Sequence, residues 1–314
     1  MRQVAVRSTA PGKAILFGEH AVVYGEPAIA VPVTQVRATA IIEPAVPGQG
    51  LTLEAADLGT RFNLSEAPKK APLAVAAWCT LSHLAAPAPD ATLTVRSQIP
   101  VASGLGSGAA VSAALVRALA SFVGCSLTPA EVSALVFEVE KIHHGTPSGI
   151  DNTVIAYEQP VYFERDAVSG PVLMSVGAPF TLLIADTGLP SPTRLMVERV
   201  RRSWQQDHEG YQALFGHIGH IAREARRRIE SGEIDGLGML MNKNHALLIE
   251  LGVSSPVLDG LVGAARDAGA SGAKLSGAGQ GGGIVALVAP ELTDQVAMAL
   301  MAAGAARVIR TQVE

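Results

Sequence analysis

The chain has 314 residues, 48% of them hydrophobic, and a formal net charge of −4. That length is enough for two domains with separate cores, and the composition is that of a globular protein rather than a disordered one. The acidic balance argues against nucleic acid as the main partner. Its two cysteines, Cys79 and Cys125, share no metal-binding or redox spacing, and no long apolar run indicates a signal peptide or a membrane span. We therefore expect a cytoplasmic protein without a membrane partner.

The first half of the chain alternates strand-like and helical patterns. Short apolar runs between glycines and prolines predict strands within residues 4–33, and the turn-rich segment 44–72 is expected to be a surface excursion. Helix 128–142 has the clearest start, because Thr128, Pro129 and Glu131 form a capping box with proline at the first helical position. The other predicted elements are a helix over 73–84, a strand over 91–98, a helix over 109–123, and strands over 154–157 and 161–164.

The second half begins near residue 176, where proline and glycine without a clear period predict a boundary between domains 1–176 and 177–314. The elements predicted after it are a strand over 181–185, helices within 193–231, 237–251 and 256–268, a strand over 284–288, a helix over 290–303 and a strand over 306–311. Strands and helices mix without strict alternation. This order favours an α+β fold over a doubly wound parallel sheet.

The most informative segment is PVASGLGSGAA, Pro100 to Ala110, between a predicted strand and a predicted helix. Its three glycines let several backbone N–H groups converge on an anion at a helix start, so phosphate is the expected ligand. The P-loop pattern needs a lysine after the last glycine, and none is present. A dinucleotide-binding pattern is disfavoured because Pro100 interrupts it and the acidic residue at the right distance, Glu131, opens a helix. A glycine-rich turn before a core helix remains the alternative.

Two further segments concentrate polar chemistry. Lys13, Glu19 and His20 lie among small and aliphatic residues and would be costly to bury without partners, although a lysine such as Lys13 can also extend its amine to the surface. Glu140 closes a predicted helix, and Asp151 follows a Gly/Pro turn, so the two carboxylates suit Mg²⁺ binding and proton acceptance from a hydroxyl. The adjacent His143 and His144 would point apart on a helix, which favours structural roles for them.

A second glycine loop, Gly277 to Gly283, matches the G-x-G-x-x-G pattern but is followed by a strand rather than a helix. Such a loop can close over a ligand that is held elsewhere. The loop belongs to the longer segment Lys274 to Gly283. Together with Ser8 to Gly25 and Pro100 to Ala110, this segment resembles the three motifs of the galactokinase, homoserine kinase, mevalonate kinase and phosphomevalonate kinase (GHMP) superfamily, in the expected order. GEHAVVYG from Gly18 and HGTPSGIDN from His144 are similar to the mevalonate kinase branch.

The resemblance implies an N-terminal domain like ribosomal protein S5 domain 2 and a ferredoxin-like C-terminal domain. It also implies transfer of the γ-phosphoryl group of ATP to the C5 hydroxyl of mevalonate, with Mg²⁺, and suggests a homodimer. Asp151 then matches the general base and Lys13 its ion-pair partner. The implied substrate-binding positions are Glu19, His20, Ser148, Gly277 and Ala278, with Ser276 also near the transferred phosphate. The implied nucleotide cradle consists of Pro100, Ser103, Gly104, Leu105, Gly106, Ser107, Gly108 and Ala109.

Glu140 matches the acidic Mg²⁺ ligand of the superfamily, but the loop departs from the usual pattern at one position. The serine generally assigned to Mg²⁺ is replaced by Gly108, so Ser107, a water, or Glu140 with the phosphates alone would complete the coordination. The alternative functions are a superfamily kinase for another alcohol, such as phosphomevalonate or homoserine, and a catalytically silent regulator that binds nucleotide or metabolite.

Overall fold

The computed structural model describes residues 4–144, 147–165 and 171–314. The chain forms two compact units that are interleaved along the sequence. Unit 1 comprises Met1–Gly12, Val36–Pro100 and Gly106–Glu158, and unit 2 comprises Lys13–Gln35, Val101–Leu105 and Gln159–Glu314. The boundary that the sequence predicts near residue 176 therefore falls within unit 2, and the division of the chain into domains there stays a prediction.

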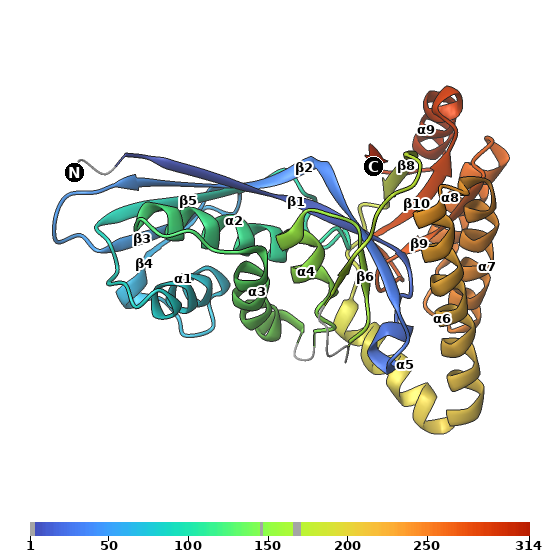
Figure 1. Ribbon diagram of the computed structural model, residues 1–314, viewed down its shortest axis with the longest axis horizontal. Coiled ribbons are helices and arrows are strands. Elements are labelled where there is room, and N and C mark those ends of the chain that lie inside the picture. Colours follow the sequence, from blue (N-terminus) through green and yellow to red (C-terminus); the bar gives the residue numbers. More distant parts are fainter. Residues whose placement is uncertain (1–3, 145–146, 166–170) are drawn as a thin grey trace. The chain divides into compact units, whose positions relative to one another are not determined.

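Unit 1 combines a sheet with a helical layer. Its strands follow the order β4-β3-β5-β2, and β1 pairs with β2. β3 and β5 run parallel, whereas β2 and β5 run antiparallel with Ala40 opposite Val95. Figure 1 shows α1 to α4 on one side of β2, β3 and β5. The bounds are β1 Val6–Phe17, β2 Ala28–Pro44, β3 Leu51–Ala55, β4 Thr60–Asn63, β5 Ala91–Ser97, α1 Pro72–His83, α2 Ser107–Phe122, α3 Pro129–His144 and α4 Ile150–Tyr157.

Local sequence signals explain the helices of unit 1. α2 is rich in alanine and buries most of its length, so small side chains let it pack closely on its neighbours. The capping box of α3 is confirmed: the carboxylate of Glu131 accepts from the N–H of Thr128 at 2.7 Å, and the hydroxyl of Thr128 accepts from the N–H of Glu131 at 3.3 Å. α4 packs against α3 through Asn152, whose amide donates to Ser133.

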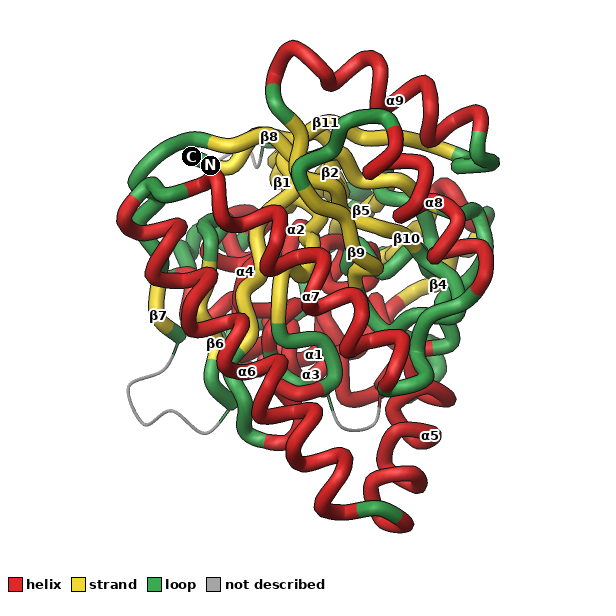
Figure 2. The backbone as a smooth tube through the Cα atoms, turned by 90° about the vertical axis from the view of Figure 1, so that its right-hand side faces the viewer, coloured by secondary structure: helices red, strands yellow, loops and turns green. Residues whose placement is uncertain are grey.

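Unit 2 contains an antiparallel sheet whose strands, in the part of the chain that the structure describes, follow the order β11-β8-β10-β9. Figures 1 and 2 show α7 and α8 covering one face of it. Its elements are β6 Val161–Phe163, β7 Val172–Leu173, β8 Phe180–Asp186, β9 Gly272–Ser276, β10 Gly283–Val288, β11 Arg307–Val313, α5 Thr193–Gln206, α6 His208–Ser231, α7 Leu237–Glu250, α8 Pro256–Asp267 and α9 Thr293–Ala302. The single-turn 3-10 helices of the chain are η1 Ala21–Tyr24, η2 Ala56–Leu58, η3 Leu64–Glu66, η4 Ile234–Gly236 and η5 Pro290–Leu292.

The core of unit 2 lies between the sheet and its helices. β8, β10 and β9 contribute alternate aliphatic side chains, α6 contributes Phe215, and α8 contributes Leu258 and Leu261. Ala21 of the first motif belongs to the same cluster. Side chains of α7 satisfy backbone N–H groups on the free edge of β9. Asn242 accepts from the N–H of Ala273 at 3.0 Å, and His245 accepts from the N–H of Leu275 at 3.3 Å.

Most predicted elements are confirmed, including the helices near 73–84, 109–123, 237–251 and 256–268. Two predictions are wrong. Residues 154–157 belong to α4 rather than to a strand, although their β-branched and aromatic residues favour strand. Segment 44–72 is not a surface excursion, because it contains β3 and β4, and β3 is a half-buried strand inside the sheet. Among the described residues, no helix is long and apolar enough to cross a bilayer.

Candidate active site

The predicted phosphate loop, Pro100 to Ala110, is divided between the units at Leu105 and Gly106. In unit 1, Gly106 caps α2 with a left-handed backbone at φ 73°, and no side chain caps the helix start. The first turn carries no acidic residue, and Gly108 is exposed there. A sixteen-residue helix with an open N-terminus presents free N–H groups and the positive end of its dipole, which is the geometry that binds phosphate.

In unit 2, the other part of the loop lies against the second glycine loop. A Cβ added to Gly277 would lie 3.8 Å from the Cα of Gly104, and one added to Gly104 would lie 3.5 Å from the carbonyl oxygen of Ser276. The N–H of Lys13 donates to the carbonyl of Leu105 at 3.0 Å. The structure thus brings together three of the segments that the sequence singles out, although Lys13 and Gly277 are far apart along the chain.

The glycines of the second loop are required by close packing. A Cβ on Gly279 would overlap the carbonyl oxygen of Val253, and one on Gly281 would lie 2.5 Å from the carbonyl oxygen of Pro190. One on Gly282 would lie 2.9 Å from the carbonyl oxygen of Ser103, a residue of the phosphate loop. Gly277, Gly279 and Gly282 also have φ between 72° and 93°, which other residues rarely adopt. Only glycine at these positions lets the loop lie this close to the neighbouring backbone.

The two predicted carboxylates, Glu140 and Asp151, lie on helices that pack together in unit 1. Glu140 is buried on α3, and Asp151 is partly exposed in the first turn of α4. Ser148 lies just before that turn, where its hydroxyl accepts from the N–H of Ile150 at 3.4 Å. Among the described residues, no group of three His, Cys, Asp or Glu side chains is placed to hold a metal ion. The side chains of His143 and His144 lie outside the described part of the chain, so the structural role predicted for them stays a prediction.

Glu19 and His20 are buried in unit 2 and have partners there. The Glu19 carboxylate accepts from the ammonium of Lys274, and its second oxygen accepts from the amide of Asn244 at 3.4 Å. His20 bonds through Nε2 to the carbonyl of Ala278 at 3.0 Å. Because a carbonyl oxygen can only accept, His20 carries its proton on Nε2. Burial lowers the pKa of His20 to about 4, although the bond to Ala278 opposes that shift, so the imidazole is neutral at pH 7.

Lys274 opens the third motif, but the sequence predicts no role for it or for Asn244 and His245. Lys274 lies on β9, Asn244 donates to Glu19, and His245 accepts from the N–H of Leu275 on β9. Burial, followed by the nearby charge of Lys274, lowers the pKa of His245 to about 4, although the Asp259 carboxylate 3.3 Å from its Nε2 opposes the shift. Burial also lowers the pKa of Lys274, against the opposing effect of Glu19. The sequence signal for Lys274 is a lysine within the strand GAKLS, whose other residues are small or apolar.

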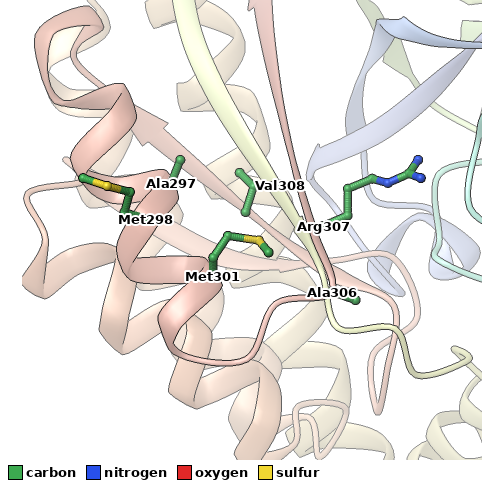
Figure 3. A pocket seen from close by; sticks show the side chains of 6 residues that line it. All are labelled: Ala297, Met298, Met301, Ala306, Arg307 and Val308. Atoms are coloured by element: carbon green, nitrogen blue, oxygen red, sulfur yellow. The ribbon is translucent and has the colours of Figure 1, made fainter.

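The structure also has an apolar hollow apart from these segments. It has a volume of about 570 Å³ and lies between α9 and β11 in unit 2, as Figure 3 shows. Its lining residues are Ala297, Met298, Met301, Ala306, Arg307 and Val308. None of them belongs to a glycine-rich segment, and they offer no cluster of groups suited to phosphoryl transfer.

Family models match both halves of the chain. The GHMP kinases N terminal domain matches residues 72–159, which include the Gly106–Ala109 part of the loop, Glu140 and Asp151. The GHMP kinases C terminal domain matches residues 224–306, which include Lys274 and the second glycine loop. The chain belongs to the GHMP kinase family. The two-domain fold that the resemblance implies is thereby confirmed.

Within the family, the similar curated relatives are mevalonate kinases. The chain is 36% identical to the mevalonate kinase of Thermococcus sibiricus over 95% of its own length and 93% of that protein. It is likewise 36% identical to the mevalonate kinase of Aeropyrum pernix, over 90% of its own length and 88% of that protein.

Solved structures of GHMP kinases agree with the chain along nearly all its length. The L. major mevalonate kinase in complex with R-mevalonate is 30% identical, with a TM-score of 0.82 over 98% of this chain and 95% of that one. The Streptococcus pneumoniae phosphomevalonate kinase also has a TM-score of 0.82, over 98% of this chain and all of that one, but is 17% identical. The second likeness shows the fold alone, so the fold does not distinguish the two substrates.

Proposed function

We propose that this protein is an ATP-dependent kinase that phosphorylates the C5 hydroxyl of mevalonate. The observation that carries the proposal is the 36% identity to mevalonate kinases over 95% of the chain. The geometry within each unit supports it. Unit 1 supplies an uncapped helix start for phosphate, and unit 2 packs the Ser103–Leu105 part of the loop, the backbone of Lys13 and the second glycine loop together.

The proposed reaction requires few covalent steps from the protein. The hydroxyl oxygen of mevalonate forms a bond to the γ-phosphorus of ATP, the bond from that phosphorus to the bridging oxygen of ADP breaks, and Asp151 accepts the hydroxyl proton. Lys13 stabilises the charge that develops on the transferred group. The backbone N–H groups of Gly106 to Ala109 hold nucleotide phosphates, so most of the catalysis is positioning. These roles rest on the resemblance of the segments.

Mg²⁺ is part of the proposal, and the donors present fit it. Mg²⁺ in kinases is held by one or two carboxylates together with substrate phosphates rather than by a cage of protein ligands. Glu140 on α3 offers a hard carboxylate oxygen of the kind that Mg²⁺ prefers. Glu140, with Ser107 as a second candidate, would hold the ion, which would neutralise charge on the phosphates. Ser107 stands in the first turn of α2, 3.4 Å from the hydroxyl of Ser97.

We also propose a cytoplasmic location without a nucleic-acid or membrane partner. This proposal rests on the net charge of −4, on two cysteines that share no metal-binding or redox spacing, and on the lack of a long apolar run in the sequence. A homodimer is proposed from the resemblance alone. Size-exclusion chromatography with light scattering tests the homodimer, and a monomeric mass would contradict it.

The second candidate function is a GHMP kinase for another alcohol, because the fold is shared with the phosphomevalonate kinase and does not distinguish the substrates. ADP release measured with mevalonate, phosphomevalonate and homoserine separates the candidates. We expect turnover with mevalonate above the other two. No turnover of mevalonate would contradict the proposed function, and binding of ATP without any turnover would favour a regulator.

The role of Asp151 gives the sharpest mechanistic test. Because the residue is proposed to accept the hydroxyl proton, Asp151→Asn should lower kcat at least about 100-fold and leave ATP affinity nearly unchanged. Asp267→Asn is the matched control, since Asp267 is exposed at the end of α8. Initial rates and ATP binding measured for both variants decide the question. A near-normal kcat for Asp151→Asn would remove this residue from the mechanism.

A further inference from the structure

Lys274 is a buried cation whose partners are all in unit 2. It lies on β9 with no exposed surface, and its ammonium donates to the Glu19 carboxylate and to the carbonyl of Leu275 at 2.6 Å. Glu19 is 1% exposed, and Asn244 donates to its other oxygen. Burying a charge is costly unless the charge is paired and hydrogen-bonded, so each member of this pair depends on the other.

Besides the ion pair, the first motif has other connections to β9 and to the second glycine loop that follows it. The hydroxyl of Ser276 donates to the carbonyl of Ile15 at 3.0 Å and accepts from its N–H at 3.1 Å. His20 reaches the carbonyl of Ala278. Lys274 and Ser276 alternate with the core residues of β9, so their side chains leave the same face of the strand.

The backbone of the first motif is strained where the ion pair holds it. His20 follows Glu19 directly and has φ 60° and ψ −48°, a conformation that non-glycine residues seldom adopt. Such strain persists only where the surrounding contacts fix it. Here the fixed contacts are the Glu19 carboxylate on one side and the Ala278 carbonyl on the other.

Charge adds a second reason for the pair. Mevalonate and ATP are both anions, so an uncompensated carboxylate beside them would repel them. Pairing with Lys274 removes that net charge, and the burial of Glu19 keeps its oxygens on protein donors.

We propose that Lys274 is a positioning residue that fixes the Gly18–Gly25 segment relative to the Gly277–Gly283 loop by holding Glu19, and that Glu19 acts through this ion pair rather than by contacting substrate. This inference rests on the proposed function in so far as those two segments flank the substrate and the transferred phosphate.

The test uses the full-length protein and the variants Lys274→Met, Glu19→Gln and the double variant. Each single variant leaves one buried charge unpaired, and we expect kcat to fall at least about 10-fold with KM for mevalonate changed less than about threefold, since a small misplacement of reacting groups acts mainly on kcat. Lys243→Met is the matched control, because Lys243 is exposed on α7 one residue before Asn244. It should behave as the unsubstituted protein.

The double variant separates positioning from a purely structural role. Removing both charges leaves neither group unpaired, so its melting temperature should recover towards that of the unsubstituted protein. Its kcat should stay at least about 10-fold low, because no ion pair fixes the two segments. Recovery of kcat together with the melting temperature would overturn the inference. So would a rise in KM for mevalonate at unchanged kcat in Glu19→Gln, which would make Glu19 a substrate contact.

Amide hydrogen exchange provides a readout that does not depend on catalysis. Lys274→Met should raise exchange in residues 18–25 and 277–283 together, while Lys243→Met should not. Failure of the unsubstituted protein to phosphorylate mevalonate would contradict the proposed function. Unchanged exchange in these two segments would contradict the role of Lys274 as the connection between them.

Discussion

At the scale of single residues, the candidate site contains buried groups whose pKa values are shifted by burial. His20 and His245 are both neutral at pH 7, because burial lowers the pKa of each to about 4. His245 accepts from the N–H of Leu275 through Nδ1 and therefore donates through Nε2 towards Asp259. A protonated His245 would lose its bond to β9 and add a positive charge near Lys274.

These histidines predict a loss of stability in mild acid. Their unfolded pKa is 6.5 and their folded pKa is about 4, so below pH 6.5 the unfolded chain binds protons that the folded chain does not. Their stabilising contribution is complete above pH 6.5 and decreases as the pH falls towards 4. Between pH 7.5 and pH 5, each histidine should cost about 2 kcal/mol of unfolding free energy.

The variant His245→Asn isolates one of these contributions, since its amide oxygen can replace Nδ1 as the acceptor for Leu275. Urea denaturation at pH 7.5 and pH 5 should show that the variant loses about 2 kcal/mol less than the unsubstituted protein over that range. His217→Asn, at an exposed position of α6, is the control and should keep the full pH dependence. Equal losses in all three proteins would mean that His245 does not titrate as described.

At the scale of elements, local sequence predicts helices and strands well where capping or periodicity decides. Thr128 and Glu131 mark the start of α3, and Ser255 followed by Pro256 marks the start of α8. α4 is missed because its residues VIAY favour strand, whereas contacts with α3 through Asn152 hold them in a helix. Tertiary contacts override propensity over such a short segment.

In the candidate site, too, local sequence reveals some residues and only tertiary contacts reveal the others. Glycine-rich segments and the residues beside them could be found in the sequence because their composition is unusual. Lys274 could not be paired with Glu19, because the two residues are 255 positions apart and only the folded unit 2 brings them together. Asn244 and His245 give still less signal, since polar residues on a helix are ordinarily exposed.

The second glycine loop predicts a specific packing requirement. Gly279→Ala would place a methyl group against the carbonyl of Val253 at φ 86°, so it should destabilise the protein by more than about 2 kcal/mol and lower activity. Gly304→Ala is the matched control, because Gly304 also has a positive φ, 101°, but has no atom within 4 Å of the added Cβ. It should cost about 1 kcal/mol from backbone strain alone. Equal destabilisation of the two variants in urea melts would exclude the close approach as the cause.

At the scale of the whole molecule, the two units are interleaved rather than consecutive. β1 and β2 each contribute residues to both units, and the phosphate loop is divided between them. Unit 2 takes its ion pair with Lys274, its core residue Ala21 and the partner strand of β6 from the segment Lys13–Gln35. The greater part of unit 2, residues 159–314, is therefore incomplete without a segment that lies far earlier in the sequence.

This interleaving predicts that residues 159–314 do not fold by themselves. The isolated fragment would leave Lys274 buried without Glu19 and would expose the core surface that Ala21 covers, so its unfolding should lack a cooperative transition. Co-expression with residues 1–158 should restore a single cooperative unfolding curve, because that fragment supplies Lys13–Gln35. Circular dichroism during urea titration measures both. A cooperative transition for the isolated fragment would show that the early segment is not needed for unit 2 to fold.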